Sequence, residues 1–153
     1  MGLQFVPDKR AALSEIRRVL DAAGRAWITL PGPKPPLFAV MTDGLARHFG
    51  PEAASFADLV FSMHEADEIS RLVRGAGFGE VEVTASTKTL RLPAPADFLW
   101  QYIHSTPLAQ AAAQASNRTR EALEEEICSR WQEFVRDGSM LLEVRMTIAA
   151  AAK

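Results

Sequence analysis

The stretch that decides the fold is residues 3–30, LQFVPDKRAALSEIRRVLDAAGRAWITL. Apolar residues recur at helical spacing after Asp8, whose carboxylate is a good N-cap, and Gly24 is the expected left-handed residue behind the helix. The following run, 25–30, is apolar in both alternating sets, which is typical of a strand covered on both faces. A helix of this kind commonly joins two parallel strands. The residues therefore predict an α/β fold that the chain enters in its middle.

Composition and charge describe an ordinary globular chain. Of its 153 residues, 48% are hydrophobic and 24% charged, and the net charge is −2. This charge offers no electrostatic reason to bind nucleic acid or an anionic membrane, so neither is an expected partner. The single Cys128 excludes an internal disulfide, and the three histidines share no metal-ligand spacing, so no metal is expected. With no apolar run of membrane-spanning length and no signal-peptide pattern, we expect a cytoplasmic protein.

The remaining pattern predicts two helices, a strand, two helices and a final strand. The expected ranges are 37–49 and 65–75, then 80–92, then 95–105 and 116–136, and finally 140–149. Ser62 and Glu65 have capping-box spacing, and Gly138 is expected to end the last helix. The run 124–126, three glutamates, is interpreted as a solvated helix face. Together with 25–30 this gives three strands in a single domain, residues 1–153.

In order and spacing, these segments resemble the C-terminal half of class I S-adenosylmethionine-dependent methyltransferases, in particular the ubiquinone/menaquinone-type small-molecule branch. The resemblance is carried by three motifs: Leu3–Asp8, then Ala12-Leu13-x-Glu15-Ile16-x-Arg18-Val19-Leu20 with Gly24-Arg25, then Glu68-Ile69-x-x-Leu72-Val73-x-x-Ala76-Gly77-Phe78-x-x-Val81. It implies that the last strand lies between the other two and antiparallel to them. The expected fold class is thus α/β, a truncated Rossmann-like methyltransferase fold with a three-stranded mixed sheet and several helices.

The resemblance also implies S-adenosylmethionine as cofactor, yet the usual cofactor motifs are missing from these residues. Family members hold the cofactor with a Gly-rich loop between a strand and a helix and with a carboxylate after the next strand. The close glycines Gly75, Gly77 and Gly79 follow a helix and precede a strand, which is the wrong order. Gln4 and Phe5 fall where the family's cofactor cleft begins, so they are the candidate cofactor-binding residues. The alternative for both is an ordered N-terminal arm.

Candidate substrate-binding residues lie on segments 37–61 and 94–115, which resemble the family's lid-like helices. They are Phe38, Met41, Trp100 and His104, because aromatic and methionine side chains suit an apolar acceptor. The alternative is a core role for the first three and a surface or structural role for His104, which as a candidate general base lacks an identifiable partner carboxylate. Methyl transfer needs little more than alignment and desolvation of the acceptor, so no catalytic residue is assigned.

Two functional hypotheses remain open. The first is a methyltransferase-like protein that acts on a small molecule and is inactive as this isolated chain. The second is a non-catalytic ligand-binding or dimerisation module derived from a methyltransferase. In both, the apolar strand 25–30 would be left at a sheet edge, and such edges tend to pair. We therefore expect a homodimer, or a partner that supplies the missing strands.

Overall fold

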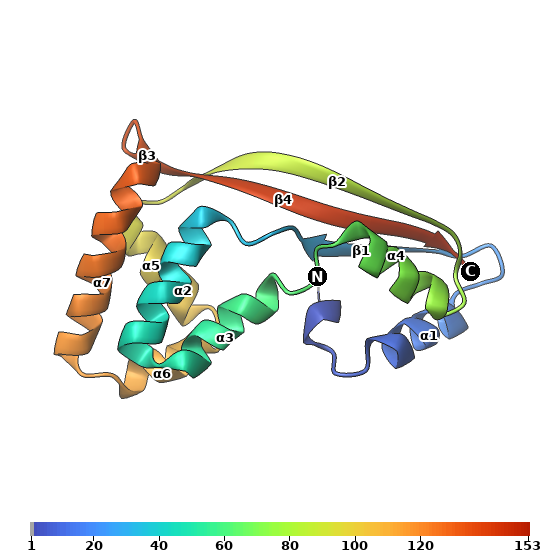
Figure 1. Cartoon of the computed structure of the whole chain (residues 1–153), viewed down its shortest axis with the longest axis horizontal. Coiled ribbons are helices and arrows are strands. Elements are labelled where there is room, and N and C mark those ends of the chain that lie inside the picture. The colour runs from blue at the N-terminus through green and yellow to red at the C-terminus, as the bar shows by residue number, and fades with distance from the viewer. Residues whose placement is uncertain (1) are drawn as a thin grey trace. The chain divides into compact units, whose positions relative to one another are not determined.

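The computed structural model describes residues 2–153, which form helices and strands (Figure 1). In chain order they are the short 3-10 helix η1 (Leu3–Phe5), α1 (Lys9–Val19), β1 (Arg25–Pro31), α2 (Pro36–Phe49), α3 (Pro51–Val60), α4 (Ala66–Gly75), β2 (Gly79–Leu92), α5 (Pro95–His104), α6 (Leu108–Gln114), α7 (Asn117–Trp131), the 3-10 helix η2 (Gln132–Phe134), β3 (Val135–Arg136) and β4 (Ser139–Ala152). Across these residues, no helix combines the length and the apolar composition needed to cross a bilayer.

The last strand lies in the middle of the sheet. The strand order is β1-β4-β2, with β3 also paired to β4. β4 runs antiparallel to β1, in a register that joins Arg25 to Ala152 and Pro31 to Met146. Figure 1 shows β2 and β4 running in opposite directions as well. The expected position of the last strand, between the other two, is confirmed.

The sheet has four strands and is antiparallel, so the prediction of a three-stranded mixed sheet is wrong. The additional strand, β3, forms a hairpin with β4, in which Val135 pairs with Met140. Asp137 and Gly138 connect the two strands with positive φ values of 49° and 75°, as a tight hairpin turn requires. α7 accordingly ends at Trp131 instead of continuing to 136, and Gly138 belongs to this turn.

Several helix boundaries also differ from the prediction. Asp8 caps α1 as expected, accepting a hydrogen bond from the Ala11 N–H at 2.8 Å, but the helix ends at Val19. Gly24 does not adopt a left-handed conformation. Its N–H instead donates to the Asp21 carbonyl at 2.8 Å, and a Cβ at this position would lie 2.9 Å from that oxygen. Close approach in a tight turn, not backbone handedness, therefore requires glycine.

Two helices, α3 and α6, were not predicted as separate elements. α6 is built from the Ala/Gln-rich sequence at 108–114, where short polar and apolar residues alternate without a clear periodic face. The capping box is absent: Glu65 is the N-cap of α4 but its side chain makes no capping bond, and the Ser62 hydroxyl donates to the Leu59 carbonyl.

The chain forms two compact units. The first comprises the described residues up to Pro33 together with 59–88 and 144–153. In it, α1 and α4 pack beside each other on one face of the sheet (Figure 1), and Leu13, Leu30 and Ile69 are buried between these layers. On the other face of β1, Trp27 is 66% exposed. Within this chain β1 is therefore covered on one face, not on both as predicted.

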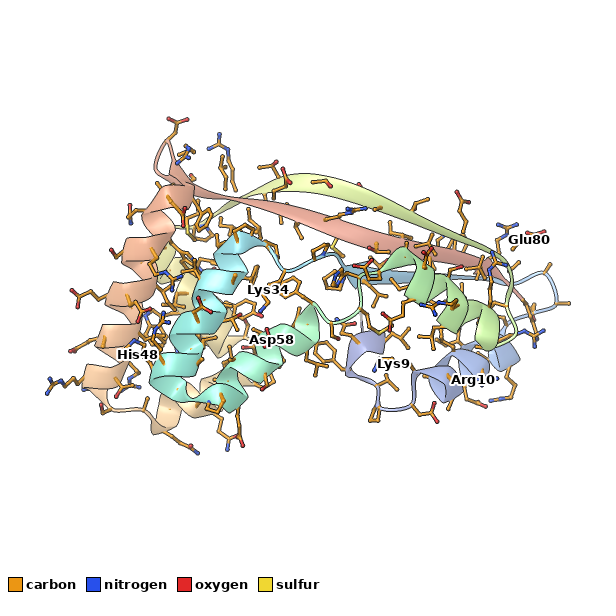
Figure 2. The ribbon with its side chains drawn as sticks, viewed as in Figure 1. Lys9, Arg10, Lys34, His48, Asp58 and Glu80 are labelled. Atoms are coloured by element: carbon orange, nitrogen blue, oxygen red, sulfur yellow. The ribbon has the colours of Figure 1, made fainter. Side chains whose placement is uncertain are left out.

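The second unit comprises residues 34–58 and 89–143. α7 packs against both α2 and α5, and α5 also contacts α6. The fully buried Trp131 donates its indole N–H to the Leu37 carbonyl at 2.9 Å, which joins α7 to the start of α2. Lys34 and Asp58 form an ion pair between the segment before α2 and the helix α3 (Figure 2).

Candidate functional site

The second unit has a surface pocket between α5 and α7. Its volume is about 290 Å³. The lining residues are Trp100 and His104 of α5 and Asn117, Arg120, Glu121 and Glu124 of α7. Residues three, four and seven apart lie on one face of a helix, so each helix contributes a single stripe. The helix α7 is fixed at its start by Ser116, whose hydroxyl accepts the Thr119 N–H at 3.1 Å.

Trp100 is held in place from two sides. Its indole N–H donates to Glu124 Oε2, and its ring stacks on His104 with the centroids 5.6 Å apart and the planes 27° from parallel. The hydrogen bond links the two helices across the pocket. The indole is therefore oriented before any ligand binds.

The pocket is acidic. Within the described residues, neither Glu121 nor Glu124 has a basic group within ion-pair distance. Burial, reinforced by the negative charge of Glu124, raises the pKa of the Cys128 thiol. The pocket's basic side chain, Arg120, donates instead to Asn117 Oδ1 and, at 3.5 Å, to the Ala112 carbonyl. Neither carboxylate at the pocket wall is therefore ion-paired within residues 2–153.

Of the four candidate substrate-binding residues, the structure brings Trp100 and His104 together in this pocket. Phe38 and Met41 lie elsewhere, in the core of the second unit, where Met41 is fully buried and Phe38 is 8% exposed. The Phe38 ring packs against Tyr102 at a centroid distance of 5.3 Å. Burial raises the pKa of the Tyr102 hydroxyl to about 12.

The acidic wall of the pocket was missed by the sequence analysis, and the interpretation of 124–126 as a solvated face is wrong for two of its three residues. Glu124 accepts the Trp100 indole N–H, and Glu126 accepts hydrogen bonds from Arg47 and from His48, the latter at 2.9 Å. Only Glu125 is exposed. Consecutive helical residues point about 100° apart, so three consecutive glutamates can meet three different surroundings. The stripe of Asn117, Glu121 and Glu124 was the available signal.

The candidate cofactor residues lie in the first unit. Gln4 is 2% exposed, and its side-chain oxygen has no hydrogen-bond partner within residues 2–153, while Phe5 is 45% exposed. One orphaned acceptor does not form a cradle for S-adenosylmethionine. The glycine cluster does not form one either, because Gly77, with φ of 91°, terminates α4 beside the Arg17 side chain. The residues present do not fit the cofactor that the resemblance implies.

A second, more polar pocket of about 240 Å³ lies in the first unit and contains His64. The imidazole is engaged on both sides: its Nδ1 lies 3.0 Å from the Phe61 carbonyl and its Nε2 lies 3.1 Å from Glu65 Oε1. Arg145 and Thr147 line the same pocket from β4. His64 is thus separate from the pocket that contains Trp100 and His104.

Comparison with known proteins gives matches among solved structures alone. No family model matches the sequence, and no curated protein matches it. Two matched structures are of Haemonchus contortus phosphoethanolamine N-methyltransferase 2, one with phosphomonomethylethanolamine and S-adenosylhomocysteine and one with S-adenosyl-L-methionine. They are 17% and 16% identical, with TM-scores of 0.44. A third, from Bacillus halodurans C-125 and provisionally named a methyltransferase, is 16% identical with a TM-score of 0.51.

These matches cover 99% of this chain but 31%, 31% and 60% of the other chains, so the chain spans less than two thirds of each matched structure. Identities this low bear on the fold alone, and of the three structures the one from Bacillus has the higher TM-score. Over the part that it spans, the chain has an α/β, Rossmann-like methyltransferase fold like that of the Bacillus structure.

Proposed function

We propose that the chain is the C-terminal half of a methyltransferase domain that acts on a small molecule, of the ubiquinone/menaquinone type, and that alone it does not transfer methyl groups. The observation that carries this proposal is the placement of β4. A final antiparallel strand enters between β1 and β2, in the order that the resemblance implies for the seventh, fifth and sixth strands of that family. The proposal keeps the cytoplasm as the expected location.

In this proposal the pocket between α5 and α7 binds the methyl acceptor. Trp100, oriented by Glu124 and stacked on His104, supplies a flat apolar wall against which an acceptor can be aligned. The methyl group itself comes from S-adenosylmethionine when that cofactor is bound by a complete domain. The residues of this chain contribute orientation and partial exclusion of water, and they provide no cofactor cradle.

Two measurements test the proposal. Calorimetric titration of the isolated chain with S-adenosylmethionine should show no binding tighter than the millimolar range. Low-micromolar binding would overturn the proposal that the isolated chain is inactive. Either the coding DNA upstream of Met1 or a neighbouring gene should encode a strand, a Gly-rich loop and a helix. When that product is joined to or mixed with this chain, cofactor binding should appear. If no such coding sequence exists, the methyltransferase assignment loses its support.

A second candidate is a dimerisation module, and the surface around β1 favours it. Within the described residues β1 pairs with β4 on one side alone, so its other edge has open backbone groups. Trp27 beside this edge is 66% exposed, and an apolar pocket of about 240 Å³ lined in part by Leu3, Ile16 and Trp27 adjoins it. Edge pairing of two copies, or pairing with a partner's strand, would cover these groups.

Sedimentation equilibrium tests this second candidate. The chain should form dimers at micromolar concentration, and Trp27→Glu should shift it towards monomer because a charge would then be placed in the apolar contact. A chain that stays monomeric at every concentration contradicts self-pairing. Val19→Glu, at a position 67% exposed on α1, gives the charge-matched comparison.

A further inference from the structure

We propose that the pocket between α5 and α7 binds a small organic cation, an alkylammonium group. It combines two carboxylates that have no ion-pair partner among residues 2–153 with an aromatic wall that is held by a hydrogen bond to Glu124. The inference rests on the proposed function in one respect: if the chain serves a methyltransferase, the cationic group is the part of the acceptor that this pocket holds, and the methyl group goes to another atom of the acceptor, because an ammonium nitrogen has no lone pair. Cation binding itself does not require that function.

The two carboxylates of the pocket favour a cationic ligand. Glu121 and Glu124 stand one turn apart on α7 and both line the pocket. In the same unit Glu126 is paired with Arg47 and Asp43 with Arg130, whereas Glu121 and Glu124 have no ion-pair partner among residues 2–153. A pair of unneutralised carboxylates at a concave surface attracts a cationic ligand and repels an anionic one.

The aromatic wall of the pocket also favours a cation. The negative face of an indole attracts cations within about 6 Å of its centroid, and quaternary ammonium groups are bound in proteins by such walls. Trp100 is half-buried, lines the pocket, and is held by Glu124. The carboxylate and the indole therefore act on the same ligand without a conformational change in either.

The pocket also contains one basic side chain, that of Arg120. Arg120 would repel a cation, but its guanidinium is engaged by Asn117 Oδ1 and the Ala112 carbonyl near the end of α6. Carbonyl groups at a helix C-terminus carry partial negative charge, which offsets part of the arginine charge. At about 290 Å³ the pocket is at the lower limit of ordinary ligand sites, which run from about 300 to 1,000 Å³. This favours a compact head group over an extended molecule.

The experiment follows the indole N–H signals of the three tryptophans by NMR while tetramethylammonium chloride is added at pH 8, with sodium chloride held at matching ionic strength. Trp100→Phe assigns the signal of the pocket, and Trp27 and Trp131 serve as internal references. The Trp100 signal should shift and saturate with a Kd on the order of 10 mM. tert-Butanol, a neutral molecule of similar shape, should leave it unmoved.

Glu124→Gln is the decisive variant, because glutamine can still accept the indole N–H while the charge is lost. It should weaken tetramethylammonium binding about five-fold, and Glu121→Gln should act in the same direction. Glu125→Gln, on the exposed side of the same helix, is the matched control and should bind as the unmodified chain does.

The inference is overturned if the Trp100 signal does not respond to the cation, if tert-butanol moves it equally, or if Glu124→Gln and Glu125→Gln behave alike. None of these results involves S-adenosylmethionine. A failure here together with a successful reconstitution of cofactor binding would reject the cation site and leave the proposed function standing. The opposite combination would reject the methyltransferase assignment and leave a cation-binding module.

Discussion

Replacing Gly32 with alanine tests the pairing of β1 with β4, on which the strand order depends. Directly after β1, the Gly32 N–H donates to the Arg145 carbonyl of β4 at 2.6 Å. A Cβ at this glycine would lie 2.7 Å from that oxygen and 2.8 Å from the Arg145 Cβ. The first obstacle is backbone, so a side-chain rotation cannot relieve it.

The magnitude follows from this geometry. Ordinary contact begins near 3.4 Å, so the two strands must separate locally by about 0.7 Å. The hydrogen bond then lengthens beyond good geometry, which costs about 1 kcal/mol, and residual strain adds about 1 kcal/mol more. Gly32→Ala should therefore lower the free energy of unfolding by about 2 kcal/mol. With an m-value of about 2 kcal/mol/M, the urea midpoint falls by about 1 M.

Gly75→Ala is the matched control, because nothing lies within 4 Å of a Cβ there and the position is the last of α4. Alanine at that site should leave stability unchanged or raise it by up to about 1 kcal/mol. Hydrogen exchange gives a second measurement, in which the amides of β1 lose protection in Gly32→Ala alone. If Gly32→Ala is as stable as the unmodified chain, then β1 does not approach β4 as described and the strand order must be reconsidered.

Two further predictions concern the second unit. The hydrogen-bonded Arg47 guanidinium, together with His48, lowers the pKa of Glu126 from 4.5 to about 2. This depressed pKa contributes stability that is present above about pH 4.5 and is lost as the pH falls towards 2. After allowance for solvent screening, the free energy of unfolding should fall by about 1 kcal/mol over this pH range. Urea titrations at a series of pH values should show this fall in the unmodified chain and in Glu125→Gln, but not in Glu126→Gln. Trp131→Phe removes a buried hydrogen bond to a carbonyl of α2 and part of a fully buried ring. It should lower the free energy of unfolding by about 2–3 kcal/mol, whereas unchanged stability would contradict the packing of α7 on α2.

Much of the fold could be predicted because its signals are local. The N-cap at Asp8, the strand β1, the helix α4 and the long strand β2 each depend on capping chemistry or periodicity within one segment. The position of β4 was predicted from a family resemblance, which contains information that no single segment holds. The hairpin at Asp137 and Gly138 was also a local signal, but it was interpreted as a helix end.

The candidate site was predicted less well, for a physical reason. Trp100 and His104 were named because they lie on a segment that resembles the family's lid-like helices, and they do share a pocket. Their opposite wall, Glu121 and Glu124, comes from another helix, and no pattern within one segment shows which helices pack together. For the same reason the sequence did not show that Phe38 lies outside the pocket, because an aromatic residue has the same pattern whether it lies in a core or lines a cleft.

By itself, then, the sequence determined the α/β class, the central placement of the last strand through its family resemblance, and the missing glycine loop, because these depend on spacing along the chain. The tertiary structure decided which of three consecutive glutamates faces Trp100, which pairs with Arg47 and which meets solvent. It also decided that Trp27 is exposed beside an open strand edge. Those outcomes depend on which surfaces pack against one another, and that is a property of the folded chain that no local pattern contains.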